Sequence, residues 1–463
     1  MALARGWKVL LCTSVAVYLV SLDVTIVNIA FPAMLADFEG TSRAGLSWVL
    51  SGYNIAFAAS LLTAGRLADR MGRRRIFFTG LAVFVVASAI CGLAPTAGLL
   101  IAGRVLQAIG GALILPASLA LVLPEFPVER RSAAIGVWGA IGGLAAATGP
   151  ILGSVLVEHV DWRAVFFVNG PLGLVAWLYG RRLLVESSDP AAGGVPDVLG
   201  AVLGVSSVGF LCLAIIQGDD WGYSDERVVG SFVAAIVLLP VFLLRCRRST
   251  NPVLDLTLFR RRFFSVGNSA SFLFSMGFFA MIFVNVQYLT GVWGYSILSA
   301  GLAFVPGPLM AAVVAGPAGR AADRIGHRWV IAPGALLFGV STMWLIAFVG
   351  TEPAYWTVWF PSSVVMGIGV GLTISTLGSA SNAFLPPDRF AMGSAFNSTA
   401  RQVGAALGIA VVVALLDDTT AGFDRVWWFV SLSGLASGVV MVALYRRPIA
   451  DVQVPLEPEA VPA

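Results

Sequence analysis

A ten-residue motif occurs twice in the chain, each time between two long apolar segments. The first copy is GRLADRMGRR (residues 65–74) and the second is GRAADRIGHR (residues 319–328). Both copies run in the same sense, so the chain consists of two parallel repeats of one helical unit. Parallel repeats in membrane proteins are related by an axis along the membrane normal and place a binding site at their interface. The motif therefore predicts a membrane protein of two similar halves and favours a carrier.

The composition of the chain requires lipid as the solvent for much of its surface. Hydrophobic residues make up 58% of the 463 residues, charged residues make up 12%, and the mean hydropathy is +0.88. A soluble fold could not bury that much apolar surface. Because a helix needs about 20 apolar residues to cross a bilayer, we expect an all-α membrane protein with fourteen transmembrane helices. The expected spans are residues 10–35, 45–67, 76–94, 98–122, 133–157, 164–181, 198–216, 228–245, 264–289, 297–318, 329–349, 355–377, 391–415 and 426–445.

The two copies of the motif lie further apart than six spans with short loops would place them, which is roughly 200 residues. Two inserted spans, 198–216 and 228–245, account for the excess, and we expect them to be peripheral. Four prolines and no aromatic residue after Arg447 predict a disordered tail. The expected units are an N-terminal six-helix bundle, a linker with two extra helices, a C-terminal six-helix bundle and a cytoplasmic tail, over residues 1–185, 186–250, 251–447 and 448–463.

The basic residues predict the orientation of the spans, because positively charged loops resist translocation. With both termini in the cytoplasm, Arg104 and Arg401 fall within spans and most other basic residues lie inside. We expect a multi-pass, monomeric protein of a bacterial inner membrane. The net charge of +4 then reflects topology and indicates no nucleic-acid partner. The basic residues left in outer loops are Arg43, Arg163, Arg227 and Arg425.

Residues that bind metals, nucleotides or reacting groups are sparse. His159 lies in an outer loop and His327 lies in the second copy of the motif. Lys8 is the only lysine, and the sequence contains no Gly-x-x-x-x-Gly-Lys loop, so we do not expect ATP to drive the protein. We expect no metal, no cofactor and no catalytic residue, and a proton gradient as the energy source. The cysteines, which we expect to pack without disulfides, are Cys12, Cys91, Cys212 and Cys246.

Asp23 is the only carboxylate within a predicted span. An ionised carboxylate in hydrocarbon costs roughly 2.5 to 3.5 kcal/mol on insertion scales, so it should face a cavity and have a partner. Asp23 lies roughly 22 Å from the cytoplasmic face, and Arg104 lies roughly 8 Å from the outer face. In a core of about 30 Å these depths coincide. The spacing allows an Asp23–Arg104 pair, with Arg401 nearer the midplane.

Two roles for this pair are open. In the first, Asp23 binds and releases the coupling proton as burial and Arg104 alternately dominate its protonation. In the second, the two residues form a permanent ion pair that joins the first span to the fourth and never titrates. We expect the first role.

The sequence LDVTIVNIAFP (residues 22–32) resembles the first-helix signature of the fourteen-helix drug:proton antiporters of the major facilitator superfamily. By length and helix plan the chain is similar to exporters of the methylenomycin-resistance kind. The resemblance implies the major facilitator fold and proton-coupled antiport. It extends to the loop motif at 65–76, RVLQ at 104–107, GPILG at 149–153, the segment from Trp162 to Pro171, the second loop motif, and NSTARQ at 397–402.

The loop motif is expected to join helices at the cytoplasmic face in one state of a transport cycle. Its glycines permit close backbone approach, and its aspartate can pair with the arginines that follow. The alternative is that the arginines only enforce topology and bind anionic lipid. Two copies of the motif favour the latch. The latch residues that we expect are Gly65, Asp69, Arg70, Gly72, Arg73, Asp323 and Arg324.

The fifth span is rich in glycine and ends in a Gly149, Pro150 and Gly153 motif. Small residues let helices pack closely, and proline permits a bend. In the family that the chain resembles this motif is associated with exporters, which argues for antiport over uptake. Ordinary small-residue packing is the alternative. The chain departs from the family at Ala108 and Ser154, where glycine is usual.

The expected substrate is a hydrophobic or amphiphilic small molecule. No second carboxylate lies in the spans of the C-terminal half, whereas Arg104 and Arg401 are both embedded. We therefore expect neutral, zwitterionic or anionic amphiphiles to be better substrates than dications. Aromatic faces offer apolar contact without strict geometry. The expected substrate contacts are Asn28, Gln107, Trp138, Phe279, Phe283, Asn397 and Arg401, with Trp48, Tyr53, Phe57, Phe278 and Tyr288 also on the cavity wall.

The sequence as a whole favours a proton-coupled secondary transporter that exports such compounds by rocking of the two halves. A dedicated exporter of one metabolite, antibiotic or lipid is the first alternative. A membrane sensor that kept the fold without transporting is the second. An enzyme is not expected.

Overall fold

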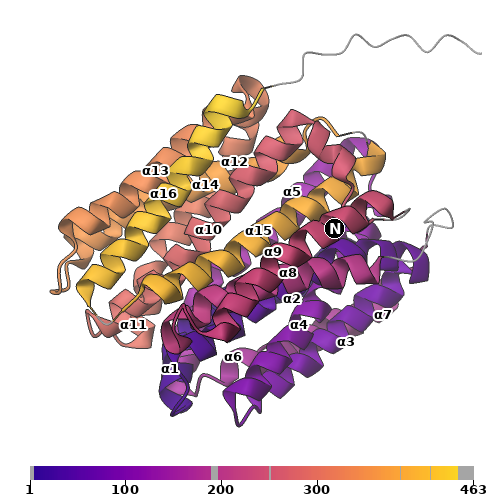
Figure 1. The fold of residues 1–463 in the computed structure, drawn as a ribbon. Coiled ribbons are helices and arrows are strands. Elements are labelled where there is room, and N and C mark those ends of the chain that lie inside the picture. Colours follow the sequence, from indigo (N-terminus) through magenta and orange to yellow (C-terminus); the bar gives the residue numbers. More distant parts are fainter. Residues whose placement is uncertain (1–4, 189–196, 250–251, 386, 418, 447–463) are drawn as a thin grey trace, which may run out of the picture.

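The computed structural model describes residues 5–188, 197–249, 252–385, 387–417 and 419–446, and within them all regular structure is helical (Figure 1). The predicted tail, 448–463, lies outside the described residues, and so do residues 189–196 of the linker that precedes the inserted helices. The helices are α1 Arg5–Asp37, α2 Arg43–Met71, α3 Arg73–Gly92, α4 Ala97–Val122, η1 Leu123–Glu125, α5 Val128–His159, α6 Ala164–Phe167, α7 Asn169–Leu183, α8 Val198–Trp221, α9 Glu226–Arg248, η2 Leu256–Arg260, α10 Arg262–Gly291, α11 Ile297–Phe304, α12 Pro306–Ile325, α13 His327–Phe348, η3 Tyr355–Trp359, α14 Phe360–Asn382, α15 Pro387–Leu415 and α16 Thr420–Leu444.

Most of the predicted spans correspond to single helices. Among the described residues, twelve helices are long and apolar enough to cross a membrane, or thirteen if α2, which bends by 48° near Leu61, is one span. The predicted span 164–181 is divided into α6 and α7 at Val168. Pro171, in the first turn of α7, has no backbone N–H to donate to the turn before it, which accounts for a break here. The multi-pass membrane fold is therefore present, and the count of fourteen stays a prediction.

The repeated motif has the same local structure in both copies. Each copy ends one helix and begins the next at a glycine with positive φ, which is 105° at Gly72 and 98° at Gly326. The amide of Gly72 donates to Ala68 O, and the amide of Gly326 donates to Ala322 O. Residues with a β-carbon rarely adopt this conformation, so both turns require glycine.

The helices pair in the same pattern in the two halves. In the first half, α1 packs against α5 and α7, and α4 packs against α2 and α3. In the second half, α10 packs against α15 and α16, and α14 packs against α12 and α13. The pattern is the one that a parallel duplication predicts. The inserted helices α8 and α9 pair with each other, and α8 lies along α2 and α15, where the halves meet (Figure 1).

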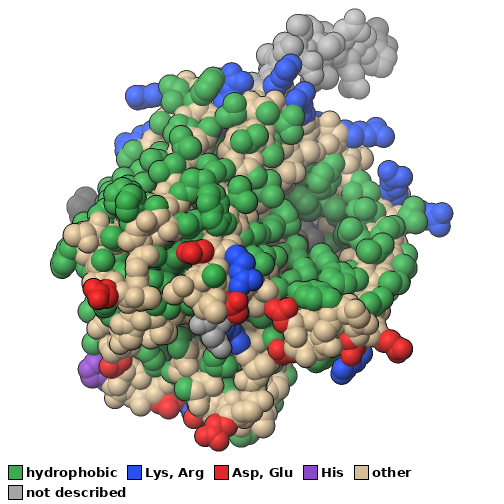
Figure 2. Space-filling model, turned by 60° about the vertical axis from the view of Figure 1, so that its left-hand side comes forward, with side chains coloured by type: hydrophobic (Ala, Val, Ile, Leu, Met, Phe, Trp, Pro, Cys, Tyr) green, Lys and Arg blue, Asp and Glu red, His purple; other side chains and the backbone are tan. Residues whose placement is uncertain are grey.

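Charge differs between the two ends of the molecule. We call the end that carries the Gly72 and Gly326 turns the basic end, and the opposite end the far end. Figure 2 shows lysine and arginine gathered along one edge of the molecule and most acidic side chains toward the other, with a broad hydrophobic band between them. The band fits a bilayer and the asymmetry fits the positive-inside rule.

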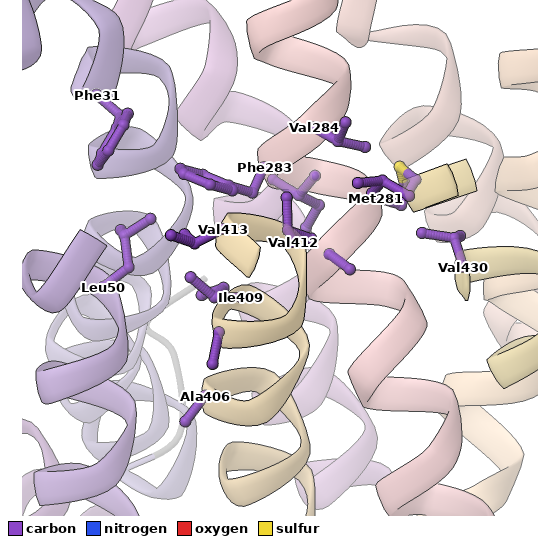
Figure 3. Close-up of a cluster of buried hydrophobic side chains, with 14 of the residues drawn as sticks. Phe31, Leu50, Met281, Phe283, Val284, Ala406, Ile409, Val412, Val413 and Val430 are labelled. Atoms are coloured by element: carbon purple, nitrogen blue, oxygen red, sulfur yellow. The ribbon is translucent and has the colours of Figure 1, made fainter. Parts of the chain in front are cut away.

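The halves share one apolar core, to which the first half contributes toward the far end. The shared core combines α1 and α2 with α10 and α15. Its Phe31 and Phe283 rings meet edge to face, with centroids 4.8 Å apart (Figure 3). Toward the basic end the first half has a cluster of its own, whereas in the second half the shared core continues to Phe264 and Tyr445 and a smaller cluster lies around Ala322. The seam between the halves is thus closed at the far end.

Hydrogen bonds between described residues of the two halves also lie toward the far end and along the seam between the halves. At the far end, Arg43 Nη1 donates to Leu416 O over 3.5 Å, and Leu298 N donates to Glu158 Oε2 over 3.4 Å. Deeper in the seam, Thr399 Oγ1 donates to Ala58 O over 3.2 Å.

Candidate functional site

Asp23 lies at the centre of a buried polar network in the first half. Its side chain and that of Arg104 are 0% and 1% exposed, and Arg104 Nη1 donates to Asp23 Oδ2. Gln107, one turn further along α4, donates from Nε2 to Asp23 Oδ1 over 2.8 Å and accepts from Arg104 Nη1 over 2.7 Å. The sequence expectation that α1 and α4 place Asp23 and Arg104 at one depth agrees with this geometry.

Two further helices contribute residues that the sequence argument did not assign to the site. Asn169, at the start of α7, donates from Nδ2 to Asp23 Oδ1 over 3.1 Å and to Ser88 Oγ over 2.8 Å. Ser88, on α3, accepts from Gln107 Nε2 over 3.2 Å and donates to Phe166 O. The α6–α7 break directly precedes Asn169, and a polar side chain beside Pro171 inside an apolar span is the signal that could have indicated it.

The guanidinium of Arg104 is held on two more sides by α2. Its Nε donates to Val49 O over 3.1 Å, and its Cζ lies 4.1 Å from the centre of the Tyr53 ring. Tyr53, which we expected on the cavity wall, therefore packs on the arginine and stacks with Phe57. A cation over an aromatic face in a desolvated site gains about 2 kcal/mol.

The network ties one buried carboxylate to the packing of three helices. Asp23 and Arg104 balance each other's charge, and the remaining partners are neutral. Donors from α4 and α7 converge on one α1 carboxylate, so a change in the angles between these helices changes how many donors it keeps. Buried polar networks respond strongly to the loss of any member. The hydrogen bonds of the Asp23 carboxylate and the arrangement of α1, α4 and α7 therefore depend on each other.

The glycine motif of α5 packs directly against the helix that carries Asp23. A β-carbon on Gly149 would lie 2.9 Å from Thr25 Cβ, and one on Gly153 would lie 2.8 Å from Ile26 Cγ1. The same stretch of α5 meets the second half, since a β-carbon on Gly301 of α11 would lie 2.8 Å from Pro150 O. The motif therefore packs one helix against both α1 and the opposite half.

This packing predicts different effects on the unfolding free energy when two glycines of α5 are replaced by alanine. Gly149→Ala should reduce the unfolding free energy by about 1 to 3 kcal/mol, because the methyl group overpacks the contact with Thr25. Gly139→Ala is the matched control, since nothing lies within 4 Å of its β-carbon, and it should be neutral or stabilising by up to about 1 kcal/mol. Melting in detergent measures both, and equal effects would contradict the close α1–α5 packing.

The first copy of the basic motif is held within its own half. Asp69 Oδ1 accepts from Arg73 Nε over 2.9 Å and from Nη2 over 2.8 Å. Glu186, which follows α7, accepts from the amides of Arg74 and Arg75 at the start of α3, over 3.0 and 3.1 Å. Its carboxylate lies against Gly72, where a β-carbon would be 2.7 Å from Glu186 Cδ. Sequence reasoning placed Glu186 in a linker and missed this contact.

The other predicted latch residues are less enclosed. Arg70 is exposed, and the nearest atom to a β-carbon on Gly65 would be Pro116 Cβ, at 3.8 Å. In the second copy, Asp323 and Arg324 are both exposed.

A smaller polar cluster lies in the second half. Asn397 of α15 donates from Nδ2 to Asn268 Oδ1 over 3.0 Å and to Ser271 Oγ over 2.9 Å, both on α10. Arg401 lies one turn further along α15 and is partly buried, and its guanidinium forms no hydrogen bond or ion pair with the described residues.

The remaining predicted substrate contacts lie in several different environments. Asn28 donates to Val24 O within α1, and Trp138 Nε1 donates to Ser118 Oγ. Phe279 is partly buried against Phe278, and Phe283 lies in the seam against Phe31. These four residues do not gather around Asp23. Trp48 borders the shared core, and the hydroxyl of Tyr288 donates to Gly350 O.

Comparison with known proteins identifies the family. A family model described as Major Facilitator Superfamily matches residues 13–247 and 268–462. The tetracenomycin C resistance and export protein of Streptomyces glaucescens is 36% identical over 419 residues, which cover 89% of this chain and 76% of that protein. The methylenomycin A resistance protein of Bacillus subtilis is 32% identical, covering 88% and 87%, and the multidrug efflux pump LfrA of Mycolicibacterium smegmatis is 32% identical, covering 88% and 80%. The resemblance expected from the sequence motifs is confirmed, and the chain belongs to the major facilitator superfamily.

Proposed function

We propose that this protein is a proton-coupled antiporter that exports hydrophobic or amphiphilic small molecules by alternating access. The observation that carries the proposal is the enclosed Asp23 network, whose partners come from helices of one half while the halves are sealed at the far end. Its relatives are resistance, export and efflux proteins, which supports export as the direction. The protein is then a transporter and not an enzyme.

The proposal includes a topology. The basic end faces the cytoplasm of a bacterium, both termini lie there, and fourteen spans cross the inner membrane, with α6 and α7 together as one of them. The protein works as a monomer without a cofactor, and the proton gradient supplies the energy. We assign the present arrangement to the state that is open toward the cytoplasm, which is supported by the position of the apolar contacts between the halves toward the far end.

Transport into inverted inner-membrane vesicles tests the proposal. Vesicles with an acidic lumen should accumulate a lipophilic substrate, and collapse of the pH gradient with nigericin should abolish accumulation. Vesicles without the protein provide the baseline. Accumulation that persists after collapse would reject proton coupling, and none across a broad panel of compounds would favour the sensor alternative. Movement of a single member of the panel would favour the dedicated exporter.

We propose further that Arg401 selects against cations and for acidic or neutral amphiphiles. Asp23 is already balanced by Arg104, whereas Arg401 has no anionic partner among the described residues. A charge-assisted hydrogen bond contributes about 1.5 to 3 kcal/mol, so Arg401→Gln should raise the KM of an acidic amphiphile roughly tenfold or more. The KM of a neutral analogue of the same shape should be unchanged. Arg425→Gln, which changes an exposed arginine at the far end, is the control. Faster transport of dicationic dyes than of acidic compounds by the unaltered protein would contradict the proposal.

A further inference from the structure

A lateral cavity lies beneath the inserted helices and is separate from the Asp23 network. Its volume is about 470 Å³, within the range of roughly 300 to 1,000 Å³ that is typical of ligand pockets. Both halves and both inserted helices contribute to its walls, so it spans the seam between the halves. Representative lining residues are Ala58 of α2, Val208 of α8, Phe242 of α9, Phe272 of α10 and Val403 of α15.

The walls of this cavity suit a hydrocarbon chain. Its lining is almost wholly apolar, and two of its polar side chains are already hydrogen-bonded within the protein. Asn268 donates to Phe264 O and accepts from Asn397, and Thr399 donates to Ala58 O. An occupant with polar groups would find few partners here, whereas an acyl chain needs none.

The segment that lines the cavity at its basic end is flanked by arginines, with Asp255 between them at the start of η2. Phe259 of η2 lines the cavity, and Arg260 and Arg261 follow it directly with exposed side chains. Arg247 and Arg248, at the end of α9, are exposed on the other side of the same connection. Basic pockets beside transmembrane helices on the cytoplasmic side bind the headgroups of anionic lipids.

We infer that the cavity holds one acyl chain of an anionic phospholipid, whose headgroup binds the arginines at the rim. The chain of the lipid would touch α2 on one side and α10 and α15 on the other. A bound lipid therefore stabilises the arrangement of the halves seen here, and α8 and α9 supply the outer wall of its site. This inference does not depend on the identity of the transported compound or on proton coupling.

Native mass spectrometry of the full chain in a neutral detergent tests this site. Phosphatidylglycerol and phosphatidylcholine with identical acyl chains are the probes. We expect one phosphatidylglycerol to be retained in preference to phosphatidylcholine. Neutralising two arginines, with Arg260→Gln and Arg261→Gln together, should weaken retention roughly 30-fold, from about 1 kcal/mol for each arginine and tenfold per 1.4 kcal/mol. Equal retention of the two lipids would overturn the inference.

Two matched variants separate the cavity from general effects. Val208→Trp fills the cavity and should abolish retention, whereas Val202→Trp on the same helix, where the side chain is 53% exposed, should leave it intact. Arg181→Gln with Arg182→Gln removes an exposed arginine pair at the basic end of the other half and should also leave it intact. Retention by a folded Val208→Trp protein would exclude the cavity as the site.

A measurement on the unaltered protein covers the case in which Val208→Trp does not fold. Phosphatidylglycerol with a photoreactive diazirine in its acyl chain should label peptides of α8, α10 and α15 in proteoliposomes. Labelling confined to other lipid-facing helices, such as α13, would overturn the inference.

Discussion

Replacement of Asp23 by asparagine is expected to abolish export driven by a pH gradient while passive exchange of substrate continues. Asparagine has nearly the same shape and still accepts a hydrogen bond from Arg104, so the packing of α1 against α4 should survive. It cannot bind or release a proton, and Asp23 is the only carboxylate within the predicted spans. Proteoliposomes loaded with substrate, with and without an imposed pH gradient, measure the two activities separately.

The matched control for this prediction is Asp37→Asn on the same helix. Asp37 lies at the end of α1, where its exposed side chain pairs with Arg163 over 2.9 Å. An exposed ion pair contributes about 0 to 1 kcal/mol, so this variant should transport normally. If Asp23→Asn retained full coupling to the gradient, the permanent ion pair would be the correct interpretation of Asp23 and Arg104.

Replacement of Arg104 by glutamine is expected to have the largest effect on stability. It leaves the Asp23 carboxylate buried without a charged partner, and the loss of one member of a buried pair costs roughly 3 to 5 kcal/mol. The contacts with Val49 O and the Tyr53 ring are lost as well. We expect a protein that unfolds at a much lower temperature in detergent and does not export.

The double variant Asp23→Asn with Arg104→Gln separates charge from packing. It removes both charges, so most of the stability lost in Arg104→Gln should return, while coupling to the gradient should stay absent. The unfolding free energies of the two single variants and the double variant give the interaction energy of the pair. A double variant no more stable than Arg104→Gln would show that the arginine acts mainly through packing on Tyr53 and Val49.

The parts of the fold that follow from helix length were predictable from the sequence. Long apolar runs and the repeated motif indicate the two halves and the inserted pair, because hydrocarbon thickness fixes how many residues a span needs. Helix ends were less predictable: α1 begins at Arg5 and α10 extends to Gly291, beyond the expected limits, because a helix can continue into the headgroup region. The division of the span 164–181 into α6 and α7 near Pro171 could not be predicted without the helices that pack around it.

Only the charged residues of the candidate site were predictable from the sequence, because a charge inside hydrocarbon carries a large free-energy cost. Asp23 and Arg104 are identifiable because each is expensive in hydrocarbon and their depths match. Asn169 and Ser88 carry no charge, and nothing in their spacing indicates which face of α7 or α3 turns toward Asp23. Phe283 shows the same limit for aromatic residues, since sequence does not distinguish a ring that closes a seam from one that contacts substrate.

The Glu186 contact distinguishes the first of two turns that have nearly identical sequences. The carboxylate binds the positive end of α3 and, together with the bond from Arg73 N to Ser187 O over 2.9 Å, ties the end of one bundle to its own hairpin. In the second turn His327 stands where Arg73 stands in the first, and its buried ring lies against Tyr445 after α16, with centroids 6.3 Å apart. A rocking motion would therefore load a carboxylate contact at one turn and an aromatic contact at the other, and duplication of one motif would have yielded two joints of different chemistry.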